Sequence, residues 1–269
     1  MKDILYHAAN TISLLQNRPG TMATSSKGRD GIYPSYPSYP SYPSRQAMNG
    51  TGTTVIELKD IEFGYLPGQS VLHRLSLKVN AGAALQLTGA NGCGKTTLIR
   101  LLNGIAFPDK GTYLFMGEPV TRQRLADSAY AKWFHQKIGY VWQNPDAQLF
   151  CSSVEEEIAF GPAQMGLSPA EIRQRTDDTL ALLHIEHLRH RAPYTLSGGE
   201  KKKTAIGTIL AINPQIWVLD EPMNDLDAAA QLWLADLLYS LQKAGKTIIF
   251  TSHEQQLAAT LHATKKDLA

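Results

Sequence analysis

Cysteine is scarce in this chain of 269 residues, which has only Cys93 and Cys151. Two cysteines are too few for a disulfide-rich scaffold, and they do not form a CxxC pair, so we interpret both as free thiols in a reducing compartment. Long apolar runs are also missing, since no segment approaches the ~18 residues that a membrane-spanning helix needs. Any membrane role must therefore come from partners. The 26 Lys and Arg nearly balance the 24 Asp and Glu, which gives no reason to expect a nucleic-acid ligand.

The first fifty residues lack the patterns of a packed core. Residues 1–15 include Asp3 and have no clean apolar centre, which argues against a signal peptide, although their apolar spacing favours a weak amphipathic helix. Residues 33–44 repeat Tyr-Pro-Ser four times, and proline at every third position favours an extended chain. We expect residues 16–50 to be a disordered linker, as a passive spacer rather than a docking tail for an aromatic-lined groove.

A glycine-rich segment is the first feature that points to chemistry. Residues 84–88 have the alternating pattern of a strand, and residues 97–103 have the pattern of a helix. The loop between them matches GxxxxGK[ST], in which backbone N–H groups cradle phosphates and Lys95 reaches the β and γ groups. This context predicts a nucleoside triphosphate site rather than a glycine turn with a solvated lysine. The candidate binding residues are Gly89, Ala90, Asn91, Gly92, Cys93, Gly94, Lys95, Thr96 and Thr97.

Two acids end a second apolar run. Residues 215–219 suit a buried parallel strand, and Asp220 and Glu221 follow at its C-terminal edge, where open α/β sheets bind ligands. Mg²⁺ takes few protein oxygens and keeps phosphate and water, so we predict that Asp220 and the Thr96 hydroxyl hold it. Glu221 is then expected to face the attacking water. The alternative, a strand-end carboxylate facing solvent, is disfavoured directly after an apolar strand.

The segment Leu-Ser-Gly-Gly-Glu at 196–200, followed by a helical pattern over 201–210, resembles the signature sequence of ATP-binding cassette (ABC) proteins. The resemblance extends over roughly residues 54–258, about three quarters of the chain. It implies that Ser197, Gly198 and Gly199 of one subunit cap the ATP held by the phosphate loop of another, at a helix N-terminus that favours an anion. The family normally has Gln where this chain has Glu200.

Further positions match the family at the expected places. Tyr65 matches the aromatic residue that stacks on adenine. Gln143, after a predicted strand at 138–142, matches the glutamine that links Mg²⁺ and water to the transport partner, and His253, after a predicted strand at 247–251, matches the histidine that contacts the γ-phosphate. Residues 224–227 match the loop that signals between subunits in the family. Met223 and Asp225 depart from the family pattern there, so this role is the one that the resemblance supports least.

The resemblance implies an α/β fold. The expected core is a P-loop ABC ATPase with a RecA-like parallel sheet, an N-terminal antiparallel β subdomain and a small α-helical lobe at about 144–196. The predicted organisation is a mostly disordered tail over 1–51, the ABC ATPase domain over 52–260 and a C-terminal tail over 261–269. Capping boxes at Ser153 with Glu156 and at Ser168 with Glu171 predict two helices of the lobe.

The implied mechanism needs two cassettes, identical or paired with a paralogue, that close on two Mg-ATP. Glu221 orients water, while Lys95, Ser197 and His253 stabilise charge on the γ-phosphate. The implied cofactors are ATP and Mg²⁺, and the implied metal contacts are Thr96, Gln143 and Asp220. Hydrolysis of ATP then reopens the dimer.

Residues 143–150 and 154–162 resemble the energy-coupling factor subgroup of importer ATPases, with a lean toward the cobalt and nickel branch. In that subgroup this stretch, Gln143 to Pro162, receives a coupling helix from a transmembrane subunit at the cytoplasmic face of the membrane. Phe150 and Phe160 are expected to line the groove, with Glu155 to Glu157 meeting basic residues or simply favouring a helix N-terminus. The rival hypothesis is a soluble ABC scaffold or regulatory ATPase without a transmembrane partner.

Two polar clusters are expected to be ordinary surface. The lysines at 201–203 are interpreted as a solvated helix face that offsets the carboxylate of Glu200. His184, His187 and His190 resemble a metal cluster, but the predicted chain break near Ile185 spoils a common helical face, so we expect them at the surface.

Overall fold

The computed structural model describes residues 52–66, 68–252 and 255–268. The expected amphipathic helix, the Tyr-Pro-Ser repeat and His253 therefore lie outside the described residues. Two sheets organise the rest, one of four strands in the order β2-β1-β4-β5 and one of five in the order β6-β7-β8-β3-β9. The strands are β1 Thr54–Leu66, β2 Gln69–Asn80, β3 Ala84–Thr88, β4 Lys110–Phe115, β5 Glu118–Pro119, β6 Ile138–Val141, β7 Ile216–Leu219, β8 Thr247–Thr251 and β9 Thr264–Asp267.

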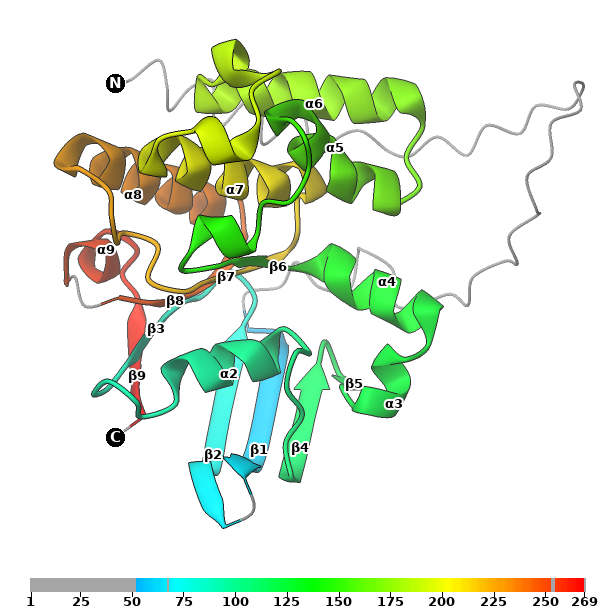
Figure 1. Ribbon diagram of the computed structural model, residues 1–269. Helices are drawn as coiled ribbons and strands as arrows, with labels where there is room; N and C mark the ends of the chain where they lie inside the picture. The colour runs from blue at the N-terminus through cyan, green and yellow to red at the C-terminus, as the bar shows by residue number, and fades with distance from the viewer. Residues whose placement is uncertain (1–51, 67, 253–254, 269) are drawn as a thin grey trace, which may run out of the picture.

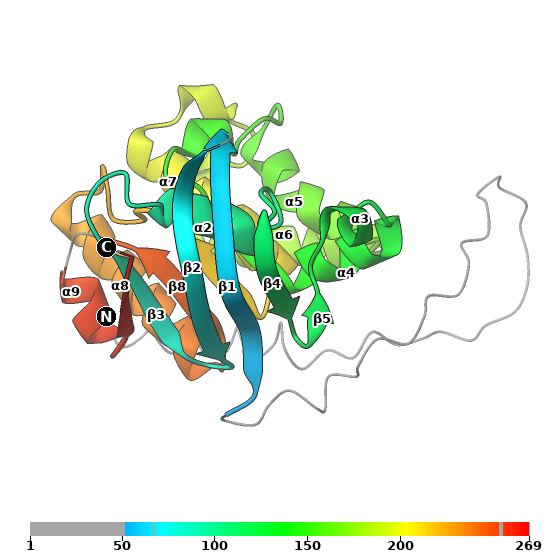
Figure 2. The ribbon, with the colours of Figure 1, turned by 90° about the horizontal axis from the view of Figure 1, so that it is seen from below.

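The smaller sheet is antiparallel throughout. Its β1 and β2 form a long hairpin that pairs Leu58 with Leu77 and Ile61 with Leu75. At Gly111, where β4 passes β1, a Cβ atom would lie 2.4 Å from the Lys59 carbonyl oxygen, and φ is +90°, so only glycine allows the approach. Figure 2 shows β1, β2 and β4 side by side with α2 behind them.

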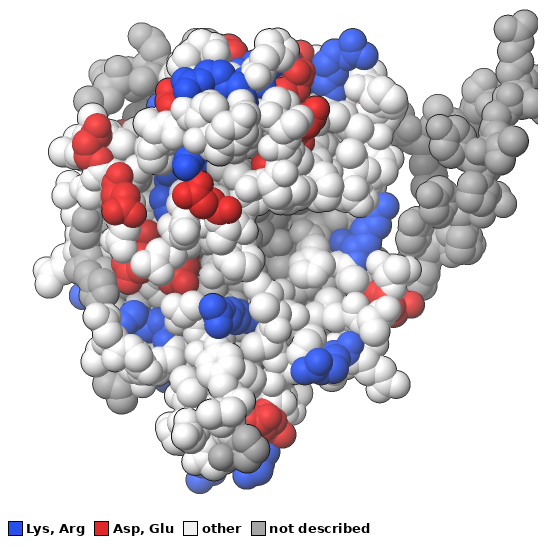
Figure 3. Space-filling model, viewed as in Figure 1, with Lys and Arg blue, Asp and Glu red and all other residues white. Residues whose placement is uncertain are grey.

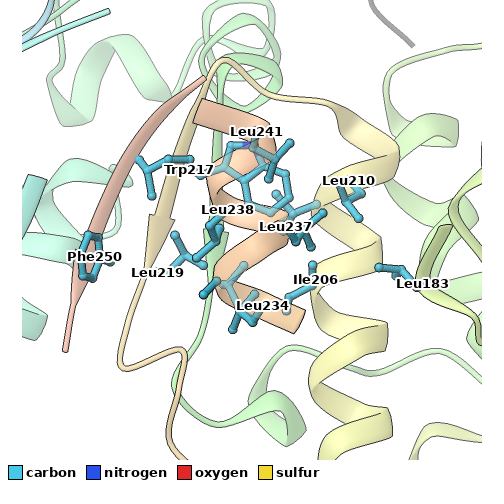
Figure 4. Close-up of a cluster of buried hydrophobic side chains, with 14 of the residues drawn as sticks. Leu183, Ile206, Leu210, Trp217, Leu219, Leu234, Leu237, Leu238, Leu241 and Phe250 are labelled. Atoms are coloured by element: carbon cyan, nitrogen blue, oxygen red, sulfur yellow. The ribbon is translucent and has the colours of Figure 1, made fainter. Parts of the chain in front are cut away.

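The larger sheet is parallel, and its central strands alternate between two cores. In β7, Trp217 and Leu219 belong to one apolar cluster while Ile216 and Val218 belong to the other. Because successive side chains of a strand point to opposite faces, the sheet must be covered on both. Figure 1 shows α7 and α8 on one face, with α2 and the antiparallel sheet on the other. Figure 4 shows Trp217 and Leu219 packed toward α8.

The helices include those of a lobe between β6 and α7. In the part of the chain that the structure describes, none of them has the length and apolar character to cross a membrane. The helices are α2 Lys95–Leu102, α3 Arg122–Leu125, α4 Ser128–Lys137, α5 Val154–Gln164, α6 Pro169–Leu183, α7 Gly198–Ile212, α8 Ala228–Lys243 and α9 Gln255–Thr260, with 3₁₀ turns η2 Pro145–Ala147, η3 Glu186–Leu188 and η4 Pro193–Thr195.

One of the two predicted capping boxes forms as expected. Ser168 accepts from the Glu171 N–H, and the Glu171 carboxylate accepts from the Ser168 N–H, at the start of α6. The box predicted for α5 is wrong in its second half. The Ser153 hydroxyl does accept from the Glu156 N–H, but the Glu156 carboxylate accepts from the N–H and hydroxyl of Ser152, one residue earlier. The helix is still capped, because the Ser153 hydroxyl accepts from an N–H of its first turn.

The chain end joins the central sheet. Residues 264–267, expected within a C-terminal tail, form β9, which is parallel to β3 with Leu85 beside Thr264 and Thr88 beside Asp267. The segment reads Thr-Lys-Lys-Asp and has no apolar strand pattern, so its pairing follows from the free edge of β3 rather than from its own sequence.

Candidate functional site

A pocket of about 600 Å³ lies at the carboxyl edge of the parallel sheet. This is the place at which open α/β sheets bind ligands, and its volume suits a nucleotide. It brings together three segments that are far apart in sequence: the phosphate loop, the two acids after β7, and Gln143 after β6. The lining residues are Tyr65, Val71, Asn91, Gly92, Gly94, Lys95, Thr96, Thr97, Gln143, Asp220, Glu221 and Asn224.

The phosphate loop joins β3 to α2 and leaves the helix start open. Gly94 is the N-cap residue at φ 101°, with no side-chain cap, and the first turn of α2 contains no acid. A Cβ at Gly94 would lie 2.9 Å from the Leu72 side chain, so the loop is held against β2. The uncapped N–H groups and the helix dipole give this end a partial positive charge. The loop is therefore built to bind an anion such as phosphate.

Lys95 lies across the same loop. Its Nζ donates to the Gly89 carbonyl at 2.8 Å and to the Ala90 carbonyl at 3.1 Å. Gly89, Ala90 and Cys93, which the sequence also predicted as binding residues, do not line the pocket. The lysine thus brings a positive charge to the pocket wall beside the start of α2.

The two acids after β7 are both buried, Asp220 at 3% exposure and Glu221 at 8%. The Thr251 hydroxyl donates to Asp220 Oδ1 at 2.7 Å, and the Glu221 N–H donates to the same hydroxyl at 2.7 Å. Tyr140 directs its hydroxyl to Asp220 Oδ2 at 3.5 Å. Burial is the largest cause that raises the pKa of Tyr140, and the charge of Asp220 adds to it. The tyrosine therefore stays a neutral donor beside the carboxylate.

The oxygen donors of the pocket fit a magnesium ion. A carboxylate from Asp220, a hydroxyl from Thr96 and an amide from Gln143 line one pocket. Mg²⁺ prefers oxygen ligands and takes few of them from protein when phosphate and water supply the others. In the described residues there is no cluster of three or more His, Cys, Asp or Glu that could hold a metal without a nucleotide. The donor set therefore suits a metal that arrives with its phosphates.

Tyr65 stands at the mouth of the pocket, with 54% of its surface exposed. Its hydroxyl lies 3.2 Å from Thr97 Oγ1 and accepts from Arg100 Nη1 at 3.2 Å. The ring meets Phe63 edge to face at 5.0 Å between centroids. These contacts fix the ring at the edge of the phosphate loop and leave much of it available for stacking.

The signature segment lies away from this pocket. Ser197 and Glu200 form a reciprocal capping box at the start of α7, in which the Glu200 carboxylate accepts from the Ser197 N–H at 2.8 Å. The interaction with Ser197 lowers the pKa of Glu200. Neither Ser197 nor the two glycines after it line the pocket. A Cβ at Gly198 or Gly199 would meet nothing within 4 Å, and neither has a positive φ. The fold of this chain alone does not require glycine at these two positions.

The interpretation of residues 201–203 as a solvated face is wrong. Lys202 is 3% exposed and donates from Nζ to the Gln143 carbonyl at 3.0 Å. Burial lowers its pKa, while the charges of Asp225 and Asp220 act in the opposite direction. Lys201 pairs with Asp146 at 2.7 Å, and Lys203 lies over the Trp233 ring. The helical spacing of 202 and 206, both buried, is the sequence signal that would have placed Lys202 inside.

Replacing Lys202 by Met should separate stability from activity. Met keeps the apolar stem but removes the donor to Gln143. We expect the free energy of unfolding to change by no more than about 1 kcal/mol, because losing a charge-assisted hydrogen bond of ~1.5–3 kcal/mol is offset by no longer burying a charge. ATP hydrolysis should fall several-fold, because Gln143 loses its backbone anchor. Lys201→Met is the matched control, and equal hydrolysis by both variants would rule out the anchoring role.

The three acids at the start of α5 do not all face outward. Glu157 is 2% exposed, and its Oε1 accepts from the backbone N–H groups of both Phe150 and Cys151. The expectation that Glu157 meets basic residues of a partner is therefore wrong, because it holds the preceding loop. Burial raises its pKa against the lowering effect of those hydrogen bonds. Glu155 pairs with Arg189 at 2.7 Å.

An aromatic pair is exposed on the lobe. Phe150 is 68% exposed and Phe160 is 44% exposed, and the rings meet edge to face at 5.0 Å. Figure 3 shows basic and acidic side chains interspersed on the face of the molecule that it presents, and that face is hollowed between the lobe and α4. His184, His187 and His190 are exposed elsewhere on the lobe. Exposed aromatic pairs are typical of surfaces that bind another chain.

Three comparisons relate this site to known proteins. The ABC transporter family profile matches residues 72–224. The nickel import ATP-binding protein LarO of Lactiplantibacillus plantarum is 50% identical over 202 residues, which are 75% of this chain and 83% of LarO. The energy-coupling factor transporter ATP-binding protein EcfA of Methanocaldococcus jannaschii is 39% identical over 203 residues, which are 76% of this chain and 71% of EcfA.

Solved structures show the same fold. The structure of cbiO1 from Clostridium perfringens, described as part of the ABC transporter complex cbiONQ, has a TM-score of 0.67 and 33% identity and covers 78% of this chain and 82% of its own. A dimeric ATP-binding cassette in a post-hydrolysis state with ADP and phosphate has a TM-score of 0.69 and 25% identity, with coverage of 76% and 90%. The antiparallel sheet, parallel sheet and helices agree with the fold class expected from the sequence.

Proposed function

The chain belongs to the ABC transporter family, whose members bind and hydrolyse ATP, and we propose that it is the ATP-binding subunit of an importer of the energy-coupling factor type. The observation that carries the proposal is the single pocket wall shared by the phosphate loop, the two buried acids and Gln143. Two curated relatives are named as nickel import proteins. With the resemblance of residues 143–162, this makes nickel or cobalt the proposed cargo.

The proposed chemistry is attack of water on the γ-phosphate. The start of α2 and Lys95 bind the phosphates, and Glu221 orients the water, since its carboxylate follows β7 at the pocket wall. His253 and the Ser197 of a second subunit are proposed to stabilise the charge that develops on the γ-phosphate. When bound through Asp220, Thr96 and Gln143, Mg²⁺ would neutralise charge on the phosphate oxygens. Tyr65 supplies a stacking surface for adenine.

Each ATP is proposed to lie between two cassettes. The support is the start of α7, where Gly198 and Gly199 have open space around their missing side chains and do not line the pocket of their own chain. Glycine at such a place is explained when another molecule approaches the backbone closely. The N–H groups of this helix start, capped by Ser197, would meet the γ-phosphate of a second copy or a paralogue. Hydrolysis at full rate by a strictly monomeric protein would contradict this arrangement.

The proposed membrane contact is the exposed pair of Phe150 and Phe160, within residues 143–162. An apolar helix from a transmembrane subunit would cover both rings, while Glu157 holds the backbone of the loop that carries Phe150. Gln143, which lines the pocket, belongs to the same segment as the two rings. Movement of the partner helix against this surface would therefore be transmitted to the pocket. The chain would then work at the cytoplasmic face of a membrane, bound to it through its partner.

Replacing Phe150 by Ser should detach the chain from its membrane partner. The tagged full-length protein is purified from solubilised membranes, and co-purifying proteins are identified by mass spectrometry. We expect an integral membrane subunit with the wild type and a loss of about tenfold or more with Phe150→Ser, as for a central aromatic anchor. Leu232→Ser, another exposed apolar residue, is the matched control and should retain the subunit. Purification of the wild type without any integral membrane protein would favour a soluble scaffold or regulatory ATPase.

A further inference from the structure

The end of β8 carries a polar side chain inside an apolar strand. Thr251 is 0% exposed and follows Ile248, Ile249 and Phe250, all of them also 0% exposed. A hydroxyl at such a position is unfavourable unless it is hydrogen-bonded, and valine would have nearly the same shape. The groups to which the Thr251 hydroxyl is hydrogen-bonded should therefore explain why threonine stands here.

Both partners of this hydroxyl belong to the catalytic edge of β7. Leu219 and Phe250 are neighbours in the parallel register, which puts Thr251 beside the two acids that follow β7. The hydroxyl accepts from the Glu221 N–H at 2.7 Å and donates to Asp220 Oδ1 at 2.7 Å. Its orientation is unambiguous, because an N–H group can only donate and a carboxylate can only accept.

The backbone at Glu221 makes this link consequential. Glu221 has φ 44°, in the left-handed region that non-glycine residues rarely adopt. A residue in such a conformation is held there by contacts with its surroundings, and the hydrogen bond from its N–H to the Thr251 hydroxyl is one of these contacts. The adjoining Ser252 carbonyl is held in turn by the buried Gln86 amide of β3 at 2.9 Å. The strand end that carries Thr251 is therefore fixed from both neighbouring strands.

We propose that Thr251 is a positioning residue that joins the metal-binding and water-orienting acids through one hydroxyl. This inference rests on the proposed roles of Asp220 and Glu221. The donated proton holds Asp220 Oδ1, so that Oδ2, which the Tyr140 hydroxyl also approaches at 3.5 Å, keeps a lone pair for Mg²⁺. The accepted N–H sets the direction of the Glu221 side chain. Movement of either acid is thereby transmitted to the other through Thr251.

The experiment compares Thr251→Val, which removes the hydroxyl and keeps the shape, with Thr251→Ser, which keeps the hydroxyl. For Thr251→Val we expect kcat to fall about 10- to 100-fold, as for groups that orient metal ligands. The magnesium effect, which is the factor by which Mg²⁺ tightens nucleotide binding, should fall by a similar amount. Affinity for ATP in EDTA, measured by calorimetry, should stay within about twofold, since the phosphate loop is untouched. Thr251→Ser should remain within about threefold of wild type in kcat and in the magnesium effect.

The matched control is Thr247→Val on the same strand. Thr247 is 2% exposed and its hydroxyl accepts from the Gly82 N–H at 3.0 Å, at the end of β8 away from the pocket. It should lower the melting temperature while leaving the magnesium effect unchanged. If Thr251→Val does not fold, the pair Thr251→Ser and Thr251→Ala, which differ by the hydroxyl alone, gives the same comparison.

Two results would overturn the inference. One is a normal kcat with a full magnesium effect in Thr251→Val. The other is a serine variant as impaired as the valine variant, which would mean that packing rather than the hydroxyl matters. Loss of hydrolysis in Glu221→Gln together with a normal Thr251→Val would reject the inference alone and leave the proposed function intact.

Discussion

Glu221→Gln should bind ATP with nearly unchanged affinity and hydrolyse it about 10² to 10⁴ times more slowly, the effect expected when a positioned acid-base group is removed. Glutamine keeps the size of the side chain and the Glu221 N–H bond to Thr251, so the backbone at this position should not move. The change removes only the carboxylate that orients water. Steady-state phosphate release gives kcat, and calorimetry gives the Kd of the nucleotide.

The control for this variant is Glu186→Gln, since Glu186 is an exposed acid in η3. It should hydrolyse ATP at the rate of the wild type. In the presence of Mg-ATP, Glu221→Gln should also accumulate as a dimer, measurable by light scattering, because the sandwiched nucleotide is no longer cleaved. Near-normal hydrolysis by Glu221→Gln would reject the role of this acid, and a monomer at saturating Mg-ATP would contradict the shared pocket.

Local patterns were sufficient for most of the core. The run over 215–219 appears as β7 with four buried residues, and the segment at 247–251 appears as β8. Both are short apolar runs bounded by polar residues, and burial on two faces follows from that composition. The box of Ser168 with Glu171 is equally local, because all its atoms come from four consecutive residues. Such features depend on neighbours in sequence and can be read directly.

The pocket required one further assumption, that parallel strands present their carboxyl ends at one edge. On that basis the phosphate loop and the two acids were expected together, and the family resemblance added Gln143. Part of the loop, both acids and Gln143 line one pocket. Val71 lines it as well and had no signal, because an apolar residue at the start of β2 is indistinguishable from core. The roles of these residues remain predictions until the variants are measured.

Contacts between distant segments could not be predicted. Lys202 and the Gln143 carbonyl are 59 residues apart, and Thr251 is 31 residues from Asp220. Lysine in a polar run is normally solvated, and threonine at a strand end is normally a packing residue. Only the approach of α7 to the loop after β6, and of β8 to β7, turns each into a hydrogen-bonding partner. The wrong partner predicted for the Glu156 carboxylate has a local cause. Ser152 offers it both an N–H and a hydroxyl, whereas the predicted partner Ser153 would offer only its N–H.

Lys95→Ala should weaken ATP binding by about 10- to 150-fold, which corresponds to loss of a charge-assisted hydrogen bond of ~1.5–3 kcal/mol. Two effects act in the same direction. The phosphates lose a positive charge beside the start of α2, and the loop loses the tie from Nζ to the Gly89 and Ala90 carbonyls. Titration calorimetry with ATP in the presence and absence of Mg²⁺ measures the change in Kd.

Two further variants are the controls, one that keeps the positive charge at position 95 and one that removes a lysine elsewhere. Lys95→Arg keeps the charge but places it on a longer, planar group that fits the narrow loop less well, so it should bind ATP between the wild type and the alanine variant. Lys110→Ala removes a lysine that pairs with Glu62 on the antiparallel sheet and should leave the Kd unchanged. If Lys95→Ala binds ATP as tightly as wild type, the glycine-rich loop is not the phosphate site. The pocket at the carboxyl edge would then have to bind its ligand through the acids alone, which an anionic nucleotide does not permit without a metal.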